Sequence, residues 1–376
     1  LLFCCHDGNI ATSHVHLKTM TDYSITLKPV YSQTVPTPDG VTLPDGWSLS
    51  WHQAETLLAL TNPDIDVVFN TAMTGDGKSL AAYLKSLQEY YCAIGLYPTN
   101  ELARDQELQV SKYLQAFKPL HEPRINRLSG AELEIYAETE KLKKADAIAT
   151  RTGQSEILVT NPDIFHYIYR GAYVFRGDAP DKLWNRIDRN FDLFIFDEFH
   201  VFGAPQITSV INTLLLIRYT SGLTRRDGTH KKFLFLSATP NEQLLNRLDK
   251  AGLRCQVVDP LIAGKYCFPS HQKELERLNL QDWRLVARSI HLKFVPLEST
   301  SKASELWLQE NAALILNQFR QHPGSKGAVI LNSIAAVKRL TPFFQDLLEP
   351  YGLKVSENTG LSGKEIREQS LFADLV

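Results

Sequence analysis

Short apolar segments recur along the chain from Trp47 onward, and polar residues end each of them. Helix-like stretches lie between these segments, such as SLAAYLKSLQEYY (79–91) and SVINTLLLIRY (209–219). Strands that are apolar on both faces and alternate with helices indicate an α/β fold, a parallel sheet covered on each side. Ligands bind such sheets at the carboxyl ends of the strands, where the polar residues fall. The strand-like segments are DVVFN (66–70), CAIGLYP (92–98), EILVTN (156–161), DLFIFDE (192–198) and KFLFLSAT (232–239).

The composition is that of a globular protein without a dominant charge. The 376 residues are 44% hydrophobic and 22% charged, which gives room for two or three domains with their own cores. The net charge is −2, so any contact with a polyanion has to be local. Two basic clusters, KLKK (141–144) and RRDGTHKK (225–232), are either such contacts or solvated surface.

Cysteine usage and hydropathy bear on the compartment. The five cysteines, at positions 4, 5, 92, 255 and 267, form no C-x-x-C pair and no spacing typical of a zinc or iron–sulfur site. This usage predicts a reduced, cytoplasmic protein. No apolar run approaches the roughly 20 residues of a membrane helix, so we expect no membrane partner.

The amino-terminal residues do not follow the regular pattern. The first methionine is Met20, and we expect residues 1–19 to be a leader that is non-native or lies upstream of the native start. Histidines and an aspartate within it resemble ligands of a metal-dependent HD phosphohydrolase. Such a site needs further His and Asp residues downstream, and none follow in a suitable pattern, so we expect no metal there. Residues 20–46 are then an N-terminal extension.

The stretch AMTGDGKS (72–79) follows one predicted strand and opens a predicted helix, as a phosphate-binding loop does. Gly75 and Gly77 let the backbone curl so that its N–H groups face a triphosphate, and the helix adds its positive N-terminal dipole. Lys78 would reach the β- and γ-phosphates of ATP, and Ser79 would bind Mg²⁺. The predicted nucleotide-binding residues are Ala72, Met73, Thr74, Gly75, Asp76, Gly77, Lys78 and Ser79.

A second motif, LFIFDEFH (193–200), is a buried strand that ends in adjacent carboxylates. On this interpretation Asp197 holds Mg²⁺, and Glu198 orients and deprotonates the attacking water. Solvated acids at a strand end are the alternative, but they would need no partner loop, and here one precedes them. Together the two motifs predict a nucleoside triphosphatase that uses ATP and Mg²⁺, with Lys78, Asp197 and Glu198 as catalytic residues.

Five motifs together resemble, in sequence and in order, those of the superfamily 2 helicases of the DEAD/DExH-box kind. The loop AMTGDGKS is similar to that family's A-x-T-G-x-G-K-T/S, DEFH (197–200) to its D-E-x-H box, and LSATP (236–240) to its S-A-T motif. Its two segments that touch the nucleic-acid backbone are similar to YPTNELARDQ (97–106) and LVTNPDIF (158–165). The resemblance implies a RecA-like ATP-binding helicase domain, which we place at residues 47–262.

The resemblance also assigns roles to single residues. Gln53 is similar to the glutamine that reads adenine in the family; a surface helix residue is the alternative. His200 would serve catalysis by linking the nucleotide site to Ser237 and Thr239. Loss of the γ-phosphate would then change the motifs that hold the nucleic-acid strand. A purely structural histidine is the alternative.

Four residues that follow predicted strands would contact nucleic-acid phosphates through hydroxyl, amide and backbone N–H groups. Such contacts position a strand without reading its sequence. The four are Thr99, Asn100, Thr160 and Asn161. Helix N-caps are the alternative for all of them, because Thr and Asn cap helices well.

The family motifs thin out after residue 262. Residues 290–297 read as a strand, 304–321 as an amphipathic helix, and 322–348 as turn, strand and helix, with GAVILNS (327–333) resembling the first motif strand of a second RecA-like domain. No G-x-D motif and no Q-x-x-G-R-x-x-R motif follows, so 263–376 is interpreted as a linker and an incomplete, truncated second RecA-like domain. The position of an arginine finger stays open. Because that arginine stabilises charge on the γ-phosphate, we expect the chain to bind ATP but to hydrolyse it and unwind poorly.

Three stretches resemble the helicase subunit of type I CRISPR interference systems, especially the subtype D form: DEFHVFGAPQ, VTNPDIFHYI and VSENTGLSGKE. That resemblance implies antiviral defence, in which the helicase moves along single-stranded DNA beside a guide-RNA effector complex whose large subunit bears the HD nuclease. Two alternatives stay open. One is another DExH helicase in DNA repair or RNA metabolism, and the other is a docking module of an effector complex that binds ATP as a structural ligand.

Overall fold

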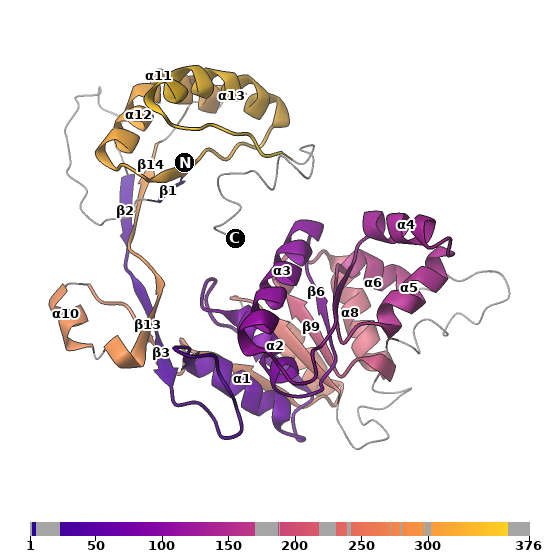
Figure 1. The fold of residues 1–376 in the computed structure, drawn as a ribbon. Coiled ribbons are helices and arrows are strands. Elements are labelled where there is room, and N and C mark those ends of the chain that lie inside the picture. The colour runs from indigo at the N-terminus through magenta and orange to yellow at the C-terminus, as the bar shows by residue number, and fades with distance from the viewer. Residues whose placement is uncertain are drawn as a thin grey trace. The chain divides into compact units, whose positions relative to one another are not determined.

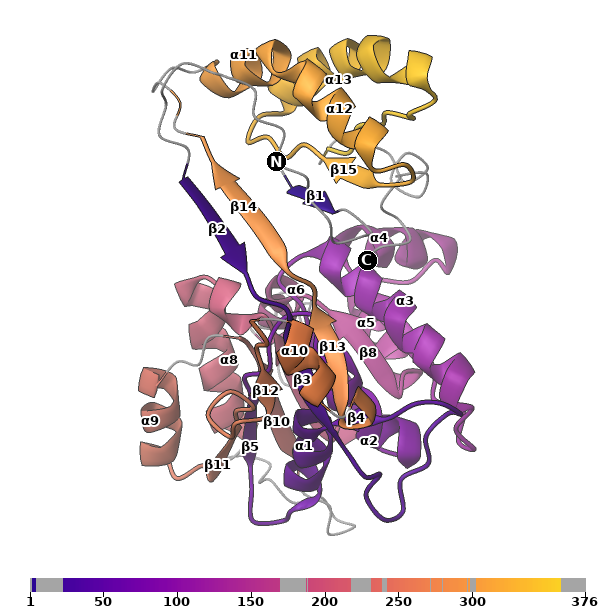
Figure 2. The same ribbon diagram turned by 90° about the vertical axis from the view of Figure 1, so that its left-hand side faces the viewer.

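The structure is a computed structural model that divides into two compact units (Figures 1 and 2). The larger unit is Leu27–Ile290, and the smaller combines Leu1–Thr26 with His291–Val376. The structure describes residues 2–4, 23–169, 187, 189–217, 231–238, 242–270, 272–278, 280–295, 297 and 302–359.

A seven-stranded sheet forms the centre of the larger unit (Figure 1). Its order is β11-β5-β10-β9-β6-β8-β7, and every neighbouring pair is parallel. The five strands predicted from apolar runs are the five central ones, so the predicted parallel sheet is confirmed. The bounds are β5 Val67–Asn70, β6 Ala93–Leu96, β7 Ile125–Leu128, β8 Ile157–Thr160, β9 Leu193–Asp197, β10 Lys232–Leu236 and β11 Cys255–Val258.

Helices cover both faces of this sheet because successive side chains of each strand point to opposite faces. On one face the ring centroids of Phe69 and Phe196 each lie 4.8 Å from that of Phe235. On the other face Ile195 and Leu234 pack in a separate buried cluster. The first face is covered by α4 (Gly130–Thr139), α5 (Lys144–Gly153), α6 (Pro162–Tyr169), α8 (Ala204–Leu216) and α9 (Glu242–Lys250), the second by α1 (Trp51–Thr61), α2 (Lys78–Gln88) and α3 (Asn100–Phe117).

A small antiparallel sheet joins residues from before and after the parallel sheet. Strand β3 (Val30–Val35) is paired with β12 (Tyr266–Cys267), β13 (Trp283–Ala287) and β4 (Leu49–Ser50). The short helix α10 (Gln272–Arg277) lies between β12 and β13 in the chain. The larger unit therefore holds most of the expected N-terminal extension and the first part of the expected linker.

The smaller unit is mainly helical. Its helices α11 (Ala303–Glu310), α12 (Ala312–Gln321) and α13 (Ile334–Leu348) pack around a buried apolar cluster. Strand β1 (Leu2–Cys4) pairs antiparallel with β15 (Lys326–Ala328), and β2 (Tyr23–Leu27) pairs with β14 (Ile290–Phe294) where the chain passes between the units. The interpretation of 263–376 as an incomplete second RecA-like domain stays a prediction, as does the leader at 1–19. In the described parts of the chain, no helix combines the length and the apolar character needed to cross a bilayer.

Candidate functional site

The glycine-rich loop connects β5 to α2, as the sequence predicts. Gly75 has φ +88° and Gly77 has φ +79°, in the left-handed region that glycine adopts without steric cost. Gly77 is the N-cap of α2, and an added Cβ there would lie 2.6 Å from Nε2 of Gln53. The loop therefore needs glycine at position 77 for two reasons, the backbone conformation and the close approach of Gln53.

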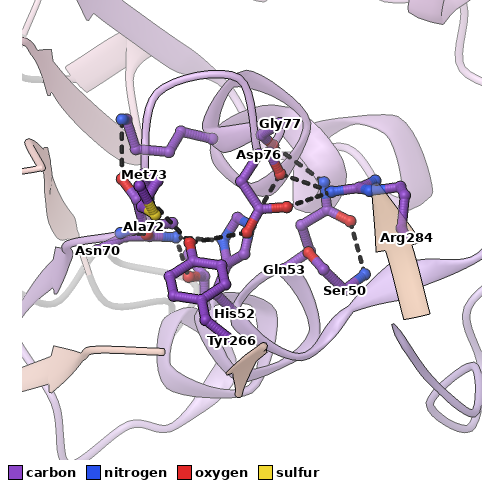
Figure 3. Close-up of polar contacts among 12 residues, drawn as sticks. Ser50, His52, Gln53, Asn70, Ala72, Met73, Asp76, Gly77, Tyr266 and Arg284 are labelled. Carbon is purple, nitrogen blue, oxygen red and sulfur yellow. Dashed lines mark hydrogen bonds and ion pairs between the residues drawn. The ribbon is translucent and has the colours of Figure 1, made fainter. Parts of the chain in front are cut away.

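Asn70, the last residue of β5, fixes the start of the loop (Figure 3). Its Oδ1 accepts from the backbone N–H of Ala72 at 2.9 Å. Its Nδ2 donates to Nδ1 of His52 and to Oγ1 of Thr56, each at 2.9 Å. Because Nδ1 of His52 accepts, the ring proton lies on Nε2, which donates to the backbone oxygen of Asp76 at 2.9 Å. This buried network ties both ends of the loop to α1.

Gln53 lies on α1 against the end of the same loop. Its Nε2 donates to the backbone oxygen of Gly77 at 3.0 Å, and its Oε1 accepts from the N–H of Ser50 at 2.9 Å. The side chain is buried, so Gln53 is not a solvent-exposed helix residue, the alternative considered above. Its contact is with the loop, and the reading of adenine by Gln53 stays a prediction.

Lys78, at the start of α2, and Asp197, at the end of β9, are buried ionisable residues. Nζ of Lys78 donates to the backbone oxygen of Ala72 at 2.9 Å. Asp197 ends β9, and its Oδ1 accepts from the N–H of Glu198 at 2.9 Å. Burial and then the charge of Glu198 raise the pKa of Asp197 to about 7, while the charge of Lys78 acts in the opposite direction. A cation at this position would favour the ionised carboxylate.

Glu198 follows Asp197 and is the N-cap of a short 3₁₀ turn, Phe199–Val201, which contains His200. Nδ1 of His200 lies 2.9 Å from Oγ of Ser237 and 3.4 Å from Oε2 of Glu198. The structure thus brings His200 and Ser237 together, as the sequence analysis expected, whereas Thr239 lies outside the described residues. The coupling role of this contact stays a prediction.

The residues at this edge of the sheet fit a magnesium ion held together with a phosphate. Ser79 at the start of α2 supplies a hydroxyl and Asp197 a carboxylate, and Mg²⁺ prefers such oxygens along with phosphate and water. Within the described residues, no group of three or more His, Cys, Asp or Glu side chains could hold a metal by itself.

The four predicted nucleic-acid contacts lie at the carboxyl ends of β6 and β8. Thr99 caps α3, because its Oγ1 accepts from the N–H of Leu102 at 3.2 Å. Asn161 accepts from the N–H of Ile164 at 2.8 Å and donates to Oδ1 of Asn100 at 2.7 Å. Capping, the alternative considered above, is thus what the side chains of Thr99 and Asn161 do in the structure.

The hydroxyl of Thr160 is buried and donates to the backbone oxygen of Leu128 at 2.9 Å. This bond joins the ends of β8 and β7. For Thr160, as for Thr99, Asn100 and Asn161, contact with a nucleic-acid strand stays a prediction.

Four residues around the loop were not found from the sequence: His52, Asn70, Tyr266 and Arg284. Tyr266 and Arg284 come from the small antiparallel sheet, and both contact Asp76. Neither lies in a motif, so only the fold connects them with the site. For His52 the sequence offered a weak signal of a role at the site, because it directly precedes Gln53, a predicted nucleotide-binding residue.

The chain is similar to known proteins over the region that contains these motifs. Residues 50–247 match the model of the DEAD/DEAH box helicase family. The fold resembles a crystal structure of the DUF1998 helicase MrfA bound to DNA and AMPPNP, with a TM-score of 0.57 and 17% identity over 87% of this chain and 41% of that one. A structure of MrfA bound to DNA gives 0.58 and 18%, over 92% and 42%. This chain therefore spans about two fifths of the MrfA chains, and no curated protein sequence matches it.

Proposed function

Because the chain belongs to the DEAD/DEAH box helicase family, we propose that it hydrolyses ATP and uses the energy to move along single-stranded DNA. One observation carries the proposal: the phosphate-type loop, the pair Asp197 and Glu198, and the contact between His200 and Ser237 all lie at the carboxyl ends of adjacent parallel strands. In sheets of this kind, that edge is where ligands bind.

Some of these residues would bind ATP, and others would act in its hydrolysis. Lys78 and the N–H groups of the loop would bind the phosphates, and Gln53 would hold adenine. Ser79 and Asp197 would hold Mg²⁺, which supplies neutralisation of charge on the phosphates when bound. Glu198 would orient the attacking water and accept its proton.

The link to the nucleic acid would start at His200. Its hydrogen bond with Ser237 at 2.9 Å joins the strand that carries the acids to the next strand of the sheet, β10. Thr99, Asn100, Thr160 and Asn161, at the ends of β6 and β8, would contact the phosphates of the strand. Thr239 would belong to the same relay.

Single-stranded DNA is the proposed track, and RNA is the alternative. Two MrfA structures, which match 87% and 92% of this chain, are of the protein bound to DNA, and this supports DNA here. Contacts to phosphates discriminate little between the two nucleic acids. A direct comparison therefore has to decide.

We propose further that this activity serves CRISPR interference, that is, antiviral defence in the cytoplasm. The support is the resemblance of DEFHVFGAPQ, VTNPDIFHYI and VSENTGLSGKE to the helicase subunit of subtype D systems. The partners would be a guide-RNA effector complex and its HD nuclease-bearing large subunit. Binding to such a complex only when it is engaged on target DNA would support this role, and equal binding to unrelated proteins would contradict it.

The first experiment measures ATP binding and ATP hydrolysis by the chain with no nucleic acid, with single-stranded DNA and with single-stranded RNA. We expect ATP to bind and Lys78→Ala to abolish binding. We expect hydrolysis to be slow, because no arginine finger is identified, but measurable and faster with DNA than with RNA. Stronger stimulation by RNA would favour an RNA helicase. ATP binding that neither nucleic acid converts into turnover would favour a docking module, and unchanged ATP binding in Lys78→Ala would contradict the site itself.

A further inference from the structure

Asp76, between the two glycines of the loop, is an acidic residue with no exposed surface. Its two carboxylate oxygens face different partners (Figure 3). Oδ1 accepts from Nη2 of Arg284 at 2.6 Å, and Oδ2 accepts from the hydroxyl of Tyr266 at 2.8 Å. Nε2 of His52 lies 3.3 Å from Oδ2 as well. A buried carboxylate with this many donors is held in one position.

The same partners also hold the backbone of the loop. Nη2 of Arg284 donates to the backbone oxygen of Asp76 at 2.7 Å, and His52 donates to that oxygen too. The hydroxyl of Tyr266 accepts from the N–H of Met73 at 2.9 Å while it donates to Asp76. Burial raises the pKa of Tyr266, so its hydroxyl keeps the proton that it donates.

The charge state of Asp76 supports these contacts. Burial alone would raise the pKa of Asp76, but its hydrogen bonds with His52, Arg284 and Tyr266 outweigh burial and lower it. The carboxylate is therefore ionised at neutral pH. An ionised group without solvent contact is stable only when it is paired, so the arginine and the loop depend on each other.

Tyr266 and Arg284 lie on β12 and β13, the neighbours of β3 on its two sides in the order β12–β3–β13. Strand β13 is followed closely in the chain by β14, and β3 is preceded by β2. Strands β2 and β14 pair with each other where the chain passes between the two units. Two strands of the sheet that holds the loop, β3 and β13, are thus connected along the chain to the pair β2 and β14.

We propose that Asp76, Tyr266 and Arg284 form a clamp that positions the phosphate-binding loop for ATP and ties its conformation to the sheet β12–β3–β13. This inference rests on the proposed function of the loop and names residues outside the helicase motifs that support it. Tyr266 and Arg284 act as positioning residues through Asp76. A loop held in advance loses less conformational freedom on binding, so the clamp strengthens ATP binding.

The test uses two mild substitutions with matched controls. Arg284→Gln and Tyr266→Phe each remove contacts to Asp76 while they keep a side chain of similar shape, and the Arg284 side chain is one-third exposed. Arg277→Gln, on the exposed end of α10, and Tyr31→Phe, on β3 of the same sheet, are the controls. Amide hydrogen exchange of residues 71–77 is measured without nucleotide, and the Kd of a fluorescent ATP analogue is measured with Mg²⁺.

We expect faster exchange in the loop and a Kd raised about tenfold for Arg284→Gln, because hydrogen bonds to a charged group are lost. Arg284→Lys should recover part of both effects, and the melting temperature should separate a local effect from unfolding. In the parent chain the ATP analogue should slow exchange along β13, and it should not do so in Arg284→Gln. Tyr266→Phe should act in the same direction, and the two controls should match the parent chain.

Loop exchange and Kd values equal to those of the controls would overturn the clamp. Equal protection of β13 by the analogue in the parent and in Arg284→Gln would overturn the link to the sheet. A parent chain that binds no ATP would instead overturn the proposed function. The exchange measurement without nucleotide reports on the clamp in either case.

Discussion

At the scale of residues, Asp197 and Glu198 show how adjacent carboxylates acquire different environments. Asp197 ends a buried strand and is almost inaccessible, whereas Glu198 is half-buried and has φ +45°, the left-handed region. A residue other than glycine rarely adopts this conformation, and such residues are common at functional sites. This difference in environment is compatible with the proposed roles, a magnesium ligand for Asp197 and a base for Glu198.

Glu198→Gln should leave ATP binding within about twofold of the parent and slow hydrolysis by on the order of 100-fold, because the amide cannot accept a proton. Equilibrium binding of ATP and single-turnover hydrolysis measure the two effects. Glu122→Gln is the matched control, since Glu122 also has positive φ, +40°, and lies away from the loop in the chain. Loss of ATP binding in Glu198→Gln would show that this acid is structural.

At the scale of elements, the unit formed by β5, the loop and α2 depends on glycine where strand passes into helix. Both glycines of the loop have positive φ, but the steric contacts of an added Cβ differ: at Gly77 it would lie 2.6 Å from Nε2 of Gln53, and at Gly75 its nearest neighbour would be the backbone oxygen of Val286 at 3.6 Å. Gly46 has nearly the same φ, +76°, with nothing within 4 Å of an added Cβ. Substitutions at Gly46 and Gly77 can therefore separate the effect of backbone strain from that of a steric contact.

Gly46→Ala should cost about 1–2 kcal/mol of unfolding free energy, the usual cost of a left-handed alanine, and should leave ATP binding unchanged. Gly77→Ala should cost more and should weaken ATP binding at least about tenfold, because the added methyl displaces Gln53 and with it the first turn of α2. Denaturant unfolding and equilibrium ATP binding measure both. Equal results for the two variants would mean that Gln53 moves freely and does not shape the loop.

At the scale of the whole molecule, the two units have separate cores. The described candidate residues all lie in Leu27–Ile290, together with the small sheet that holds Asp76. The smaller unit packs its helices around a cluster of its own. Units with separate cores are expected to unfold separately, and a ligand stabilises only the unit that binds it.

Calorimetry should therefore show two transitions, and ATP with Mg²⁺ should raise only one of them. At a hundred times its Kd the nucleotide should add about 2.7 kcal/mol to the stability of the larger unit. Lys78→Ala, which lacks the side chain proposed to contact the phosphates, should show the same two transitions without the shift. A single transition that ATP moves as a whole would contradict the independence of the units.

The sequence by itself determined the centre of the fold and the candidate residues of the site. The five central strands are apolar on both faces, and the residues of the loop and of DEFH follow two of them directly. These signals are local, so periodicity and spacing are sufficient to find them. The edge strands β7 and β11 were missed because their residues are mostly only partly buried and are not continuously apolar.

Only the tertiary structure decided what surrounds the loop. In the sequence Asp76 is one of several polar residues in a turn, whereas in the fold it is buried against Tyr266 and Arg284, 190 and 208 positions away. No local pattern marks such partners, because strand pairing in the sheet β12–β3–β13 brings them there. The sequence therefore determined which residues are candidates to bind a phosphate, and the long-range strand pairing decided which residues hold them in place.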